Sequence, residues 1–232
     1  FIMYHQVNEL LFKMILLEIK QVAKSDSLDV EVFTKHLMRI SRYFDMLSSS
    51  FDIMGDGMDK DQYMKFRNTL APASGFQSAQ YRMIEFASTE LINLIDVRFR
   101  STIDRDTPFE HAYEHLYWQA AGKNYNTGQK SILLDKFEKK YMGDFIDFMK
   151  DYNTTNISMK FKSLPDTVRN NIDLVNTMRH YDYTVNVKWV MSHYKAAAKY
   201  IGGGAATGGS DWTKYMLPKY QKRIFYPDLW SE

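Results

Sequence analysis

The chain has 232 residues, of which 45% are hydrophobic and 15% aromatic, enough for one sizeable domain with a large core. Its 30 basic and 28 acidic residues leave a net charge of +2, which gives no argument for a nucleic-acid partner. The absence of cysteine excludes disulfides, thiolate-held metal cofactors and a cysteine nucleophile. No apolar run approaches the ~20 residues of a membrane helix, and no signal peptide stands out. The lack of cysteine fits a reducing cytosol, and we expect a cytoplasmic protein without a membrane partner.

Apolar residues recur with the helical period of 3.6, and the strict alternation of strands is scarce. In the first segment a broad apolar stripe is expected from Ile2, Leu10, Met14 and Ile19, with Val7, Leu11 and Ile15 as neighbours. Helices are expected over residues 2–24, 30–52, 59–70, 76–99, 109–121, 130–151 and 165–200. No repeat or linker divides them. We therefore predict one all-α domain over residues 1–232, a bundle-like array of long helices.

The end of the last long helix is the first candidate site. Trp189 and His193 are one turn apart on one helix face, and a glycine-rich loop over residues 202–210 follows, carrying Thr207. An imidazole nitrogen suits iron, and glycines let a backbone approach a ligand closely. Taken alone, the histidine is more often a surface or core residue held by a hydrogen bond, and the loop a flexible linker.

Two more pairs repeat this one-turn spacing. Phe1 and His5 place an aromatic ring and an imidazole on one face of the first helix, where they suit a flat ligand. Tyr63 and Arg67 add a guanidinium, whose rigid fork matches a carboxylate. The alternatives are a core phenylalanine with a histidine at its rim, and a surface arginine paired with an acid.

Three separate motifs together resemble the haem-dependent tryptophan 2,3-dioxygenases. Phe66-Arg67 runs on to Pro72-x-Ser-Gly-Phe-Gln-Ser-x-Gln80, which is the most specific of the three. The others are Phe1-x-x-x-His-Gln-x-x-Glu-Leu-x-x-Lys13, and Trp189-x-x-x-His193 ahead of Thr207. The resemblance covers most of the chain and is weakest over residues 101–165 and at the C-terminal tail. It implies that the helices enclose a pocket for haem b.

The resemblance also implies a role for each candidate residue. His193 is the proximal ligand of the haem iron, and Ser74 lies near the haem edge. His5 is the catalytic residue that orients the indole N–H, and Phe1 lies beside the indole ring. Arg67 clamps the carboxylate of the amino acid, with Tyr63 as a pocket wall, and Thr207 bonds its ammonium group.

The implied reaction inserts both atoms of O2 across the C2–C3 bond of L-tryptophan and yields N-formyl-L-kynurenine. This is the step of tryptophan catabolism that opens the kynurenine pathway. The family's enzymes are homotetramers, in which residues upstream of the first helix complete a neighbour's pocket. The resemblance therefore implies a cytoplasmic homo-oligomer, a tetramer, that binds L-tryptophan or a related indole.

The chain departs from the family's pattern in three places. Val190 stands where an arginine usually follows the tryptophan, Ala206 where glycine is usual, and Asp211-Trp212 replaces a small Ser-Gly pair. These changes bear on substrate fit and lid closure more than on haem binding. Two alternatives stay open on the same scaffold: a haem mono-oxygenase acting on a modified indole, and a non-catalytic haem-binding or sensor protein.

A metal site elsewhere is a further alternative. His111 and His115 are spaced one helical turn apart, and Glu114 adds a possible third ligand. The order differs from the zinc-protease motif, in which the glutamate follows the first histidine directly. Because two histidines at this spacing arise often by chance, we do not expect a metal there.

Overall fold

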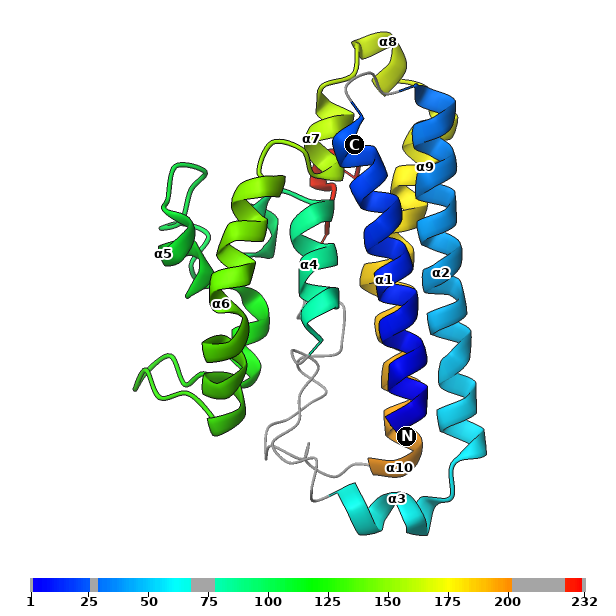
Figure 1. Cartoon of the computed structure of the whole chain (residues 1–232), viewed down its shortest axis with the longest axis vertical. Coiled ribbons are helices and arrows are strands. Elements are labelled where there is room, and N and C mark those ends of the chain that lie inside the picture. The colour runs from blue at the N-terminus through cyan, green and yellow to red at the C-terminus, as the bar shows by residue number, and fades with distance from the viewer. Residues whose placement is uncertain (1, 26–28, 68–77, 202–223, 231–232) are drawn as a thin grey trace.

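The computed structural model describes residues 2–25, 29–67, 78–201 and 224–230. Helices α1 (Ile2–Lys24) and α2 (Val30–Gly57) lie side by side and antiparallel (Figure 1). Tyr4 and Ser50 share a 2.9 Å hydrogen bond at one end of the pair. At the other end Glu18 accepts hydrogen bonds from His36 and Arg39, at 2.6 and 2.9 Å. These contacts fix the register of α1 on α2.

Helix α1 has the predicted bounds, and part of its expected apolar stripe is buried. Its buried apolar residues are Leu11, Phe12, Ile15, Ile19 and Val22. Four other residues of the stripe lie outside the core: Ile2, Val7, Leu10 and Met14 are exposed by 74, 55, 59 and 37%. The apolar arc of α1 is wider than α2 and its other neighbours can cover, so one edge of the arc stays outside the core.

Helix α2 begins where Asp29 accepts a hydrogen bond from the backbone N–H of Val32, which is a typical N-cap. It continues to Gly57, five residues beyond the predicted end at residue 52. The short α3 (Lys60–Arg67) follows at the bottom of Figure 1. Its predicted continuation over residues 68–70 lies outside the described residues.

The helix predicted over residues 76–99 is wrong beyond Ser88. Helix α4 (Ala79–Ser88) ends there, and the 3-10 turn η3 (Leu91–Leu94) follows. Thr89 is extended, and its hydroxyl donates to the carbonyl of Phe225, far along the chain. A hydrogen bond to a distant segment thus replaces the next helical turn.

The helix predicted over residues 109–121 is also interrupted. It is α5 (Phe109–Tyr113) followed by the 3-10 turn η4 (Tyr117–Ala121). Between the two, Leu116 is extended and forms an antiparallel bridge with Ile95. The bridge removes Leu116 from helical geometry.

Helix α6 (Ile132–Tyr152) agrees with the predicted 130–151 and is capped by Ser131. Helix α7 (Ile157–Lys162), capped by Asn156, was not predicted. The long helix predicted over residues 165–200 is interrupted near its start. It comprises α8 (Asp166–Arg169), α9 (Ile172–Tyr183), the π-helical segment η5 (Thr184–Trp189) and α10 (Val190–Ile201). Asn171 causes the interruption, because its side chain caps α9 by accepting from two backbone N–H groups.

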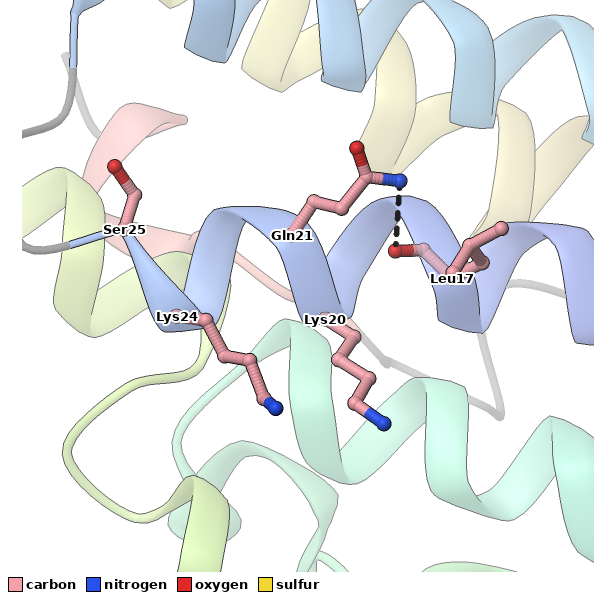
Figure 2. Close-up of a pocket in the computed structure, with 5 residues that line it drawn as sticks. All are labelled: Leu17, Lys20, Gln21, Lys24 and Ser25. Atoms are coloured by element: carbon pink, nitrogen blue, oxygen red, sulfur yellow. Dashed lines mark hydrogen bonds between the residues drawn. The ribbon is translucent and has the colours of Figure 1, made fainter.

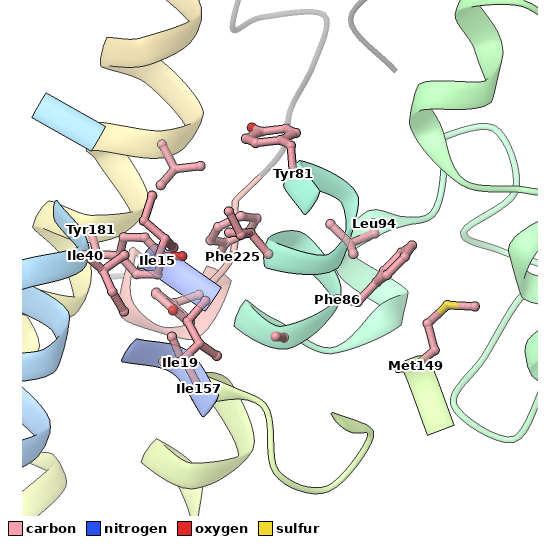
Figure 3. Packing of buried hydrophobic residues seen from close by; sticks show 14 of the residues in the cluster. Ile15, Ile19, Ile40, Tyr81, Phe86, Leu94, Met149, Ile157, Tyr181 and Phe225 are labelled. Atoms are coloured by element: carbon pink, nitrogen blue, oxygen red, sulfur yellow. The ribbon is translucent and has the colours of Figure 1, made fainter. Parts of the chain in front are cut away.

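One buried cluster joins these helices. Figure 3 shows Ile15 and Ile19 of α1, Tyr181 of α9 and Phe225 of the C-terminal segment among its members. The last described segment contains η6 (Pro227–Leu229). The all-α prediction is confirmed: the named elements of the described residues are all helical, with two isolated bridges. Among the described residues, none of the helices combines the length and the apolar character needed to cross a bilayer.

Candidate functional site

His193 lies on the face of α10 that packs against α2. Its ring stacks on Phe51, with centroids 5.2 Å apart and planes 12° from parallel. Trp189, one turn earlier, lies 6.5 Å away from it. The imidazole is half-buried rather than in open solvent. Because the imidazole of His193 contacts Phe51 through its face, the edge that carries its nitrogen atoms is not used in this stack.

The π-helical segment η5 sets the direction in which His193 points. It connects α9 to α10 without a loop and ends at Trp189. A π-helix pairs i with i+5, so it turns the following residues relative to a regular α-helix. Such segments occur often at functional sites. Here the segment aims the side chains of α10 at the C-terminal half of α2.

Aromatic rings support Trp189 on several sides. The ring of Tyr81 lies 4.7 Å from it, and Phe12 and Phe44 lie 6.1 and 6.3 Å from it. The guanidinium carbon of Arg82 lies over the ring of Tyr81, 4.5 Å from its centroid. Because these rings come from α1, α2 and α4, the start of α10 is held by three helices.

The environment of His193 keeps its ring uncharged. Burial, with a smaller contribution from the nearby His5, lowers the pKa of His193 to about 4. At neutral pH the imidazole is therefore neutral and has a lone pair to offer a metal. Within the described residues, its ring makes no hydrogen bond that would occupy that lone pair. The buried Nε1 of Trp189 likewise has no partner there.

The structure brings His5 to the same end of the bundle. The rings of His5 and Tyr4 meet edge to face at 5.5 Å, and Tyr4 lies 6.3 Å from Phe51. Phe51 in turn carries the stack with His193. His5 is exposed. The two predicted histidines thus belong to one neighbourhood although they are 188 residues apart in sequence.

Tyr63 belongs to this end as well. It is half-buried on α3, and its ring lies 5.1 Å from that of Tyr200, the penultimate residue of α10. Arg67 ends α3, but its side chain lies outside the described part of the structure. Three further predicted site residues lie outside it entirely: Phe1, Ser74 and Thr207. Of the predicted set, the structure therefore places His5, Tyr63 and His193.

Two hollows lie away from these residues. Figure 2 shows an open, shallow one on α1, lined by Leu17, Lys20, Gln21, Lys24 and Ser25. At a rise of about 1.5 Å per residue, Leu17 is roughly 18 Å along the helix from His5. The other is a small space that includes Phe86 and Met149. Neither contains a predicted site residue.

Residues 1–120 match the model of the tryptophan 2,3-dioxygenase family. The chain belongs to that family. Its relatives include the tryptophan 2,3-dioxygenase of Bacillus anthracis, 26% identical, with all of this chain and 81% of the relative aligned. Those of Caulobacter vibrioides and Ruegeria sp. are 26% and 24% identical over all of this chain and cover 86% and 81% of their own lengths.

Haem is the cofactor that the resemblance to tryptophan 2,3-dioxygenases implies, and the donor set fits it. Haem iron binds a neutral imidazole nitrogen, and His193 offers one on a helix held by aromatic packing. Among the described residues there is no group of three His, Cys, Asp or Glu side chains suited to a bare metal ion. A porphyrin-held iron needs only one such ligand from the chain.

Of the three departures from the family's pattern, the structure describes Val190. It is 4% exposed at the first position of α10. A buried valine there contributes packing, whereas a buried arginine would require a partner for its charge. Ala206 and Trp212 lie outside the described residues.

Sequence reasoning missed Phe51 and Tyr200. Phe51 lies 142 positions from the histidine on which it stacks. In the sequence Phe51 is one more apolar residue near the end of the predicted helix 30–52. Only the parallel packing of α2 and α10 reveals either residue.

The alternative metal site at His111 is not formed. Helix α5 ends at Tyr113, and the Nδ1 atom of His115 lies 2.9 Å from the backbone carbonyl of His111. Glu114 is paired with Lys123 at 2.8 Å and with Lys130 at 3.3 Å. Two ammonium groups already neutralise the carboxylate that a metal would need.

Proposed function

We propose that this chain is a haem-dependent dioxygenase that inserts O2 across the C2–C3 bond of L-tryptophan, giving N-formyl-L-kynurenine. One observation carries the proposal: in a chain that matches the tryptophan 2,3-dioxygenase family, the residue expected to bind iron is a neutral, half-buried histidine. The enzyme is accordingly an oxidoreductase. Relatives named tryptophan 2,3-dioxygenase align with the whole chain.

In this proposal His193 binds the iron of haem b, and Ser74 contacts the haem edge. The bound haem supplies the activation of dioxygen. Phe51 and Trp189 hold the imidazole of His193 through ring packing. The neutral state of that imidazole means that no proton has to leave before it binds iron at neutral pH.

The remaining proposed residues position L-tryptophan. Arg67 binds its carboxylate and Thr207 its ammonium group, so both charged ends are fixed. His5 accepts a hydrogen bond from the indole N–H, and Phe1 and Tyr63 line the pocket. Holding reacting atoms within ~3.5 Å lowers a barrier by several kcal/mol, because the entropy of alignment has already been lost on binding. Both oxygen atoms enter the substrate and no net electrons are consumed, so no reductase partner is required.

We further propose that residues 1–232 form one domain, with residues 202–210 as a loop over the site. A buried cluster among the described residues, with members from α1 to the C-terminal segment, supports this. The homotetramer of the family is proposed for this chain too. Its support is the exposed apolar row Met3, Val7, Leu10, Met14 and Leu17 along one side of α1, since such rows are commonly buried between subunits. The proposed location is the cytoplasm.

The test supplies L-tryptophan and O2 to the ferrous, haem-loaded protein. We expect the near-ultraviolet absorbance of N-formylkynurenine to appear, together with a Soret band. His193→Ala should lose the Soret band, whereas the matched control His180→Ala, at an exposed position of α9, should keep it. A His193→Ala protein with a normal haem spectrum would show that the ligand is wrong.

A haem mono-oxygenase of a modified indole is the second candidate, favoured by the buried Val190 in place of the usual arginine. The same experiment separates the two. A hydroxylated product in place of N-formylkynurenine supports the mono-oxygenase. Haem and tryptophan binding without any product would instead support a sensor.

A further inference from the structure

The hydroxyl of Tyr200 lies at the C-terminal end of α2. It donates to the backbone carbonyl of Met54 and lies 3.2 and 3.1 Å from the carbonyls of Gly55 and Met58. The last four carbonyls of a helix have no partner within that helix. Tyr200, on α10, is far from α2 in sequence but packs against it and is only 8% exposed. Its hydroxyl supplies the missing donor. One phenolic proton serves this group of acceptors.

The ring of the same side chain packs on α3. Its centroid lies 5.1 Å from that of Tyr63, with the planes inclined by 53°. Helix α3 begins only three residues after α2 ends, so the direction in which it leaves depends on how α2 is terminated. Tyr200 therefore contacts both sides of the α2–α3 corner.

Tyr200 also shares a helix face with His193. The two are seven residues apart on α10, which is about two turns. Helix α10 runs parallel to α2 along this face: Lys188 pairs with Asp45 at 2.6 Å, His193 stacks on Phe51, and Lys199 pairs with Asp56. The helix that carries the proposed iron ligand is thus joined to the α2–α3 corner by its final turn.

We propose that Tyr200 is a positioning residue that fixes α3, and Tyr63 with it, relative to the helix of His193. The tryptophan-binding side of the pocket and the iron-binding side then share one rigid junction. The role of Tyr63 in binding tryptophan rests on the proposed function. The junction itself rests on the contacts of Tyr200 alone.

The test uses Tyr200→Phe, which keeps the ring on Tyr63 and removes only the hydroxyl. Tyr183→Phe, the same change at an exposed position, is the matched control. Hydrogen exchange of the haem-free protein should show α3 amides exchanging about fivefold faster, the scale of one lost hydrogen bond. In the haem-loaded protein, the Kd for tryptophan, followed through the change in the Soret band, should rise by a similar factor. The Soret band without tryptophan should not change.

Native exchange in α3 of Tyr200→Phe would overturn the proposal, and so would exchange that accelerates equally throughout the molecule. The second result would make Tyr200 a general stabilising residue. If α3 loosens but native protein binds no tryptophan, the positioning role is supported and the proposed function fails. If α3 loosens while the Kd of native and variant protein is the same, Tyr200 does not position the pocket.

Discussion

Arg67 is the residue on which recognition of the amino acid depends most strongly in the proposed site. Arg67→Ala should weaken tryptophan binding by about 2–4 kcal/mol, because a substrate carboxylate would lose its charged, paired partner. Equilibrium dialysis of tryptophan against the haem-loaded protein measures this. Arg42→Ala, at an exposed position of α2, is the control and should bind as native. Unchanged affinity in Arg67→Ala would remove the carboxylate clamp.

Phe51 is tested through its stack with His193. Phe51→Ala removes a ring pair worth about 1 kcal/mol, so the imidazole is held less firmly and haem affinity should fall roughly fivefold. Titration of haem into haem-free protein measures the affinity. Phe148→Ala breaks a comparable stack with Tyr152 on α6, at 4.3 Å, and should leave haem binding unchanged. Equal loss in both variants would contradict a specific role for Phe51.

Among the site residues, the histidines and Tyr63 could be proposed from sequence because each lies in a local motif. A motif preserves one-turn spacing, and the fold then brings the motifs to one end of the bundle. Phe51 and Tyr200 could not be found in this way. The contacts of Phe51 with His193 and of Tyr200 with Gly55 join positions 142 and 145 residues apart, and they follow from how α10 packs on α2.

At the scale of elements, α1, α2 and α6 could be predicted because their apolar period is long and uninterrupted. The end of α4 at Ser88 could not, since the hydroxyl of Thr89 bonds to the distant Phe225. Asn171 is different. Its capping role is local and agrees with the known preference of asparagine for N-caps. The start of α9 could therefore have been predicted from the sequence.

Helix α9 holds the C-terminal segment through Arg179, whose Nε donates to the carbonyl of Leu229 at 2.7 Å, and through one buried carboxylate. Asp182, 2% exposed, accepts hydrogen bonds from the backbone N–H groups of Phe225 and Tyr226, at 2.9 and 3.1 Å. It also accepts from the indole of Trp230 at 2.9 Å and from Asn186 at 2.6 Å. Burial raises the pKa of Asp182 even so. These hydrogen bonds therefore stabilise the carboxylate of Asp182 in the core.

Asp182→Ala should lower the free energy of unfolding by about 3 kcal/mol, because four donors lose their acceptor in the interior. Urea unfolding measures the loss, and hydrogen exchange should show residues 224–230 released first. Asp147→Ala, exposed on α6, is the control and should unfold as native. A loss below 1 kcal/mol would show that water replaces the carboxylate.

For the whole molecule, the lowered pKa of His193 predicts how stability depends on pH. The pKa is about 4 in the folded chain and about 6.5 in an unfolded one. Between these values the unfolded state binds more protons, so stability rises with pH. The contribution is present above pH ~6.5 and is lost as the pH falls towards ~4. Its upper bound is about 3 kcal/mol, reduced by the partial exposure of the ring.

Urea unfolding of the haem-free protein at pH 7 and pH 4.5 tests this, with His193→Gln as the comparison. Native protein should lose more stability on acidification than the variant, because glutamine does not titrate. Carboxylates titrate in both proteins, and their effect cancels in the difference. An identical pH dependence would mean that the imidazole is hydrated in solution.

The π-helical segment between α9 and α10 has a consequence for how the chain can vary. A regular α-helix advances by about 100° per residue. Six π-helical residues turn the chain about as far as five α-helical residues would, so deleting one residue within Thr184–Trp189 would let the stretch become an ordinary α-helix with little change in direction. Winding all six residues as an α-helix would instead add the rotation of one residue. Every side chain downstream would then swing around the axis, and the imidazole would leave Phe51 for a different neighbour. The way these six residues wind, more than their chemical identity, sets the direction in which the side chains of α10 point.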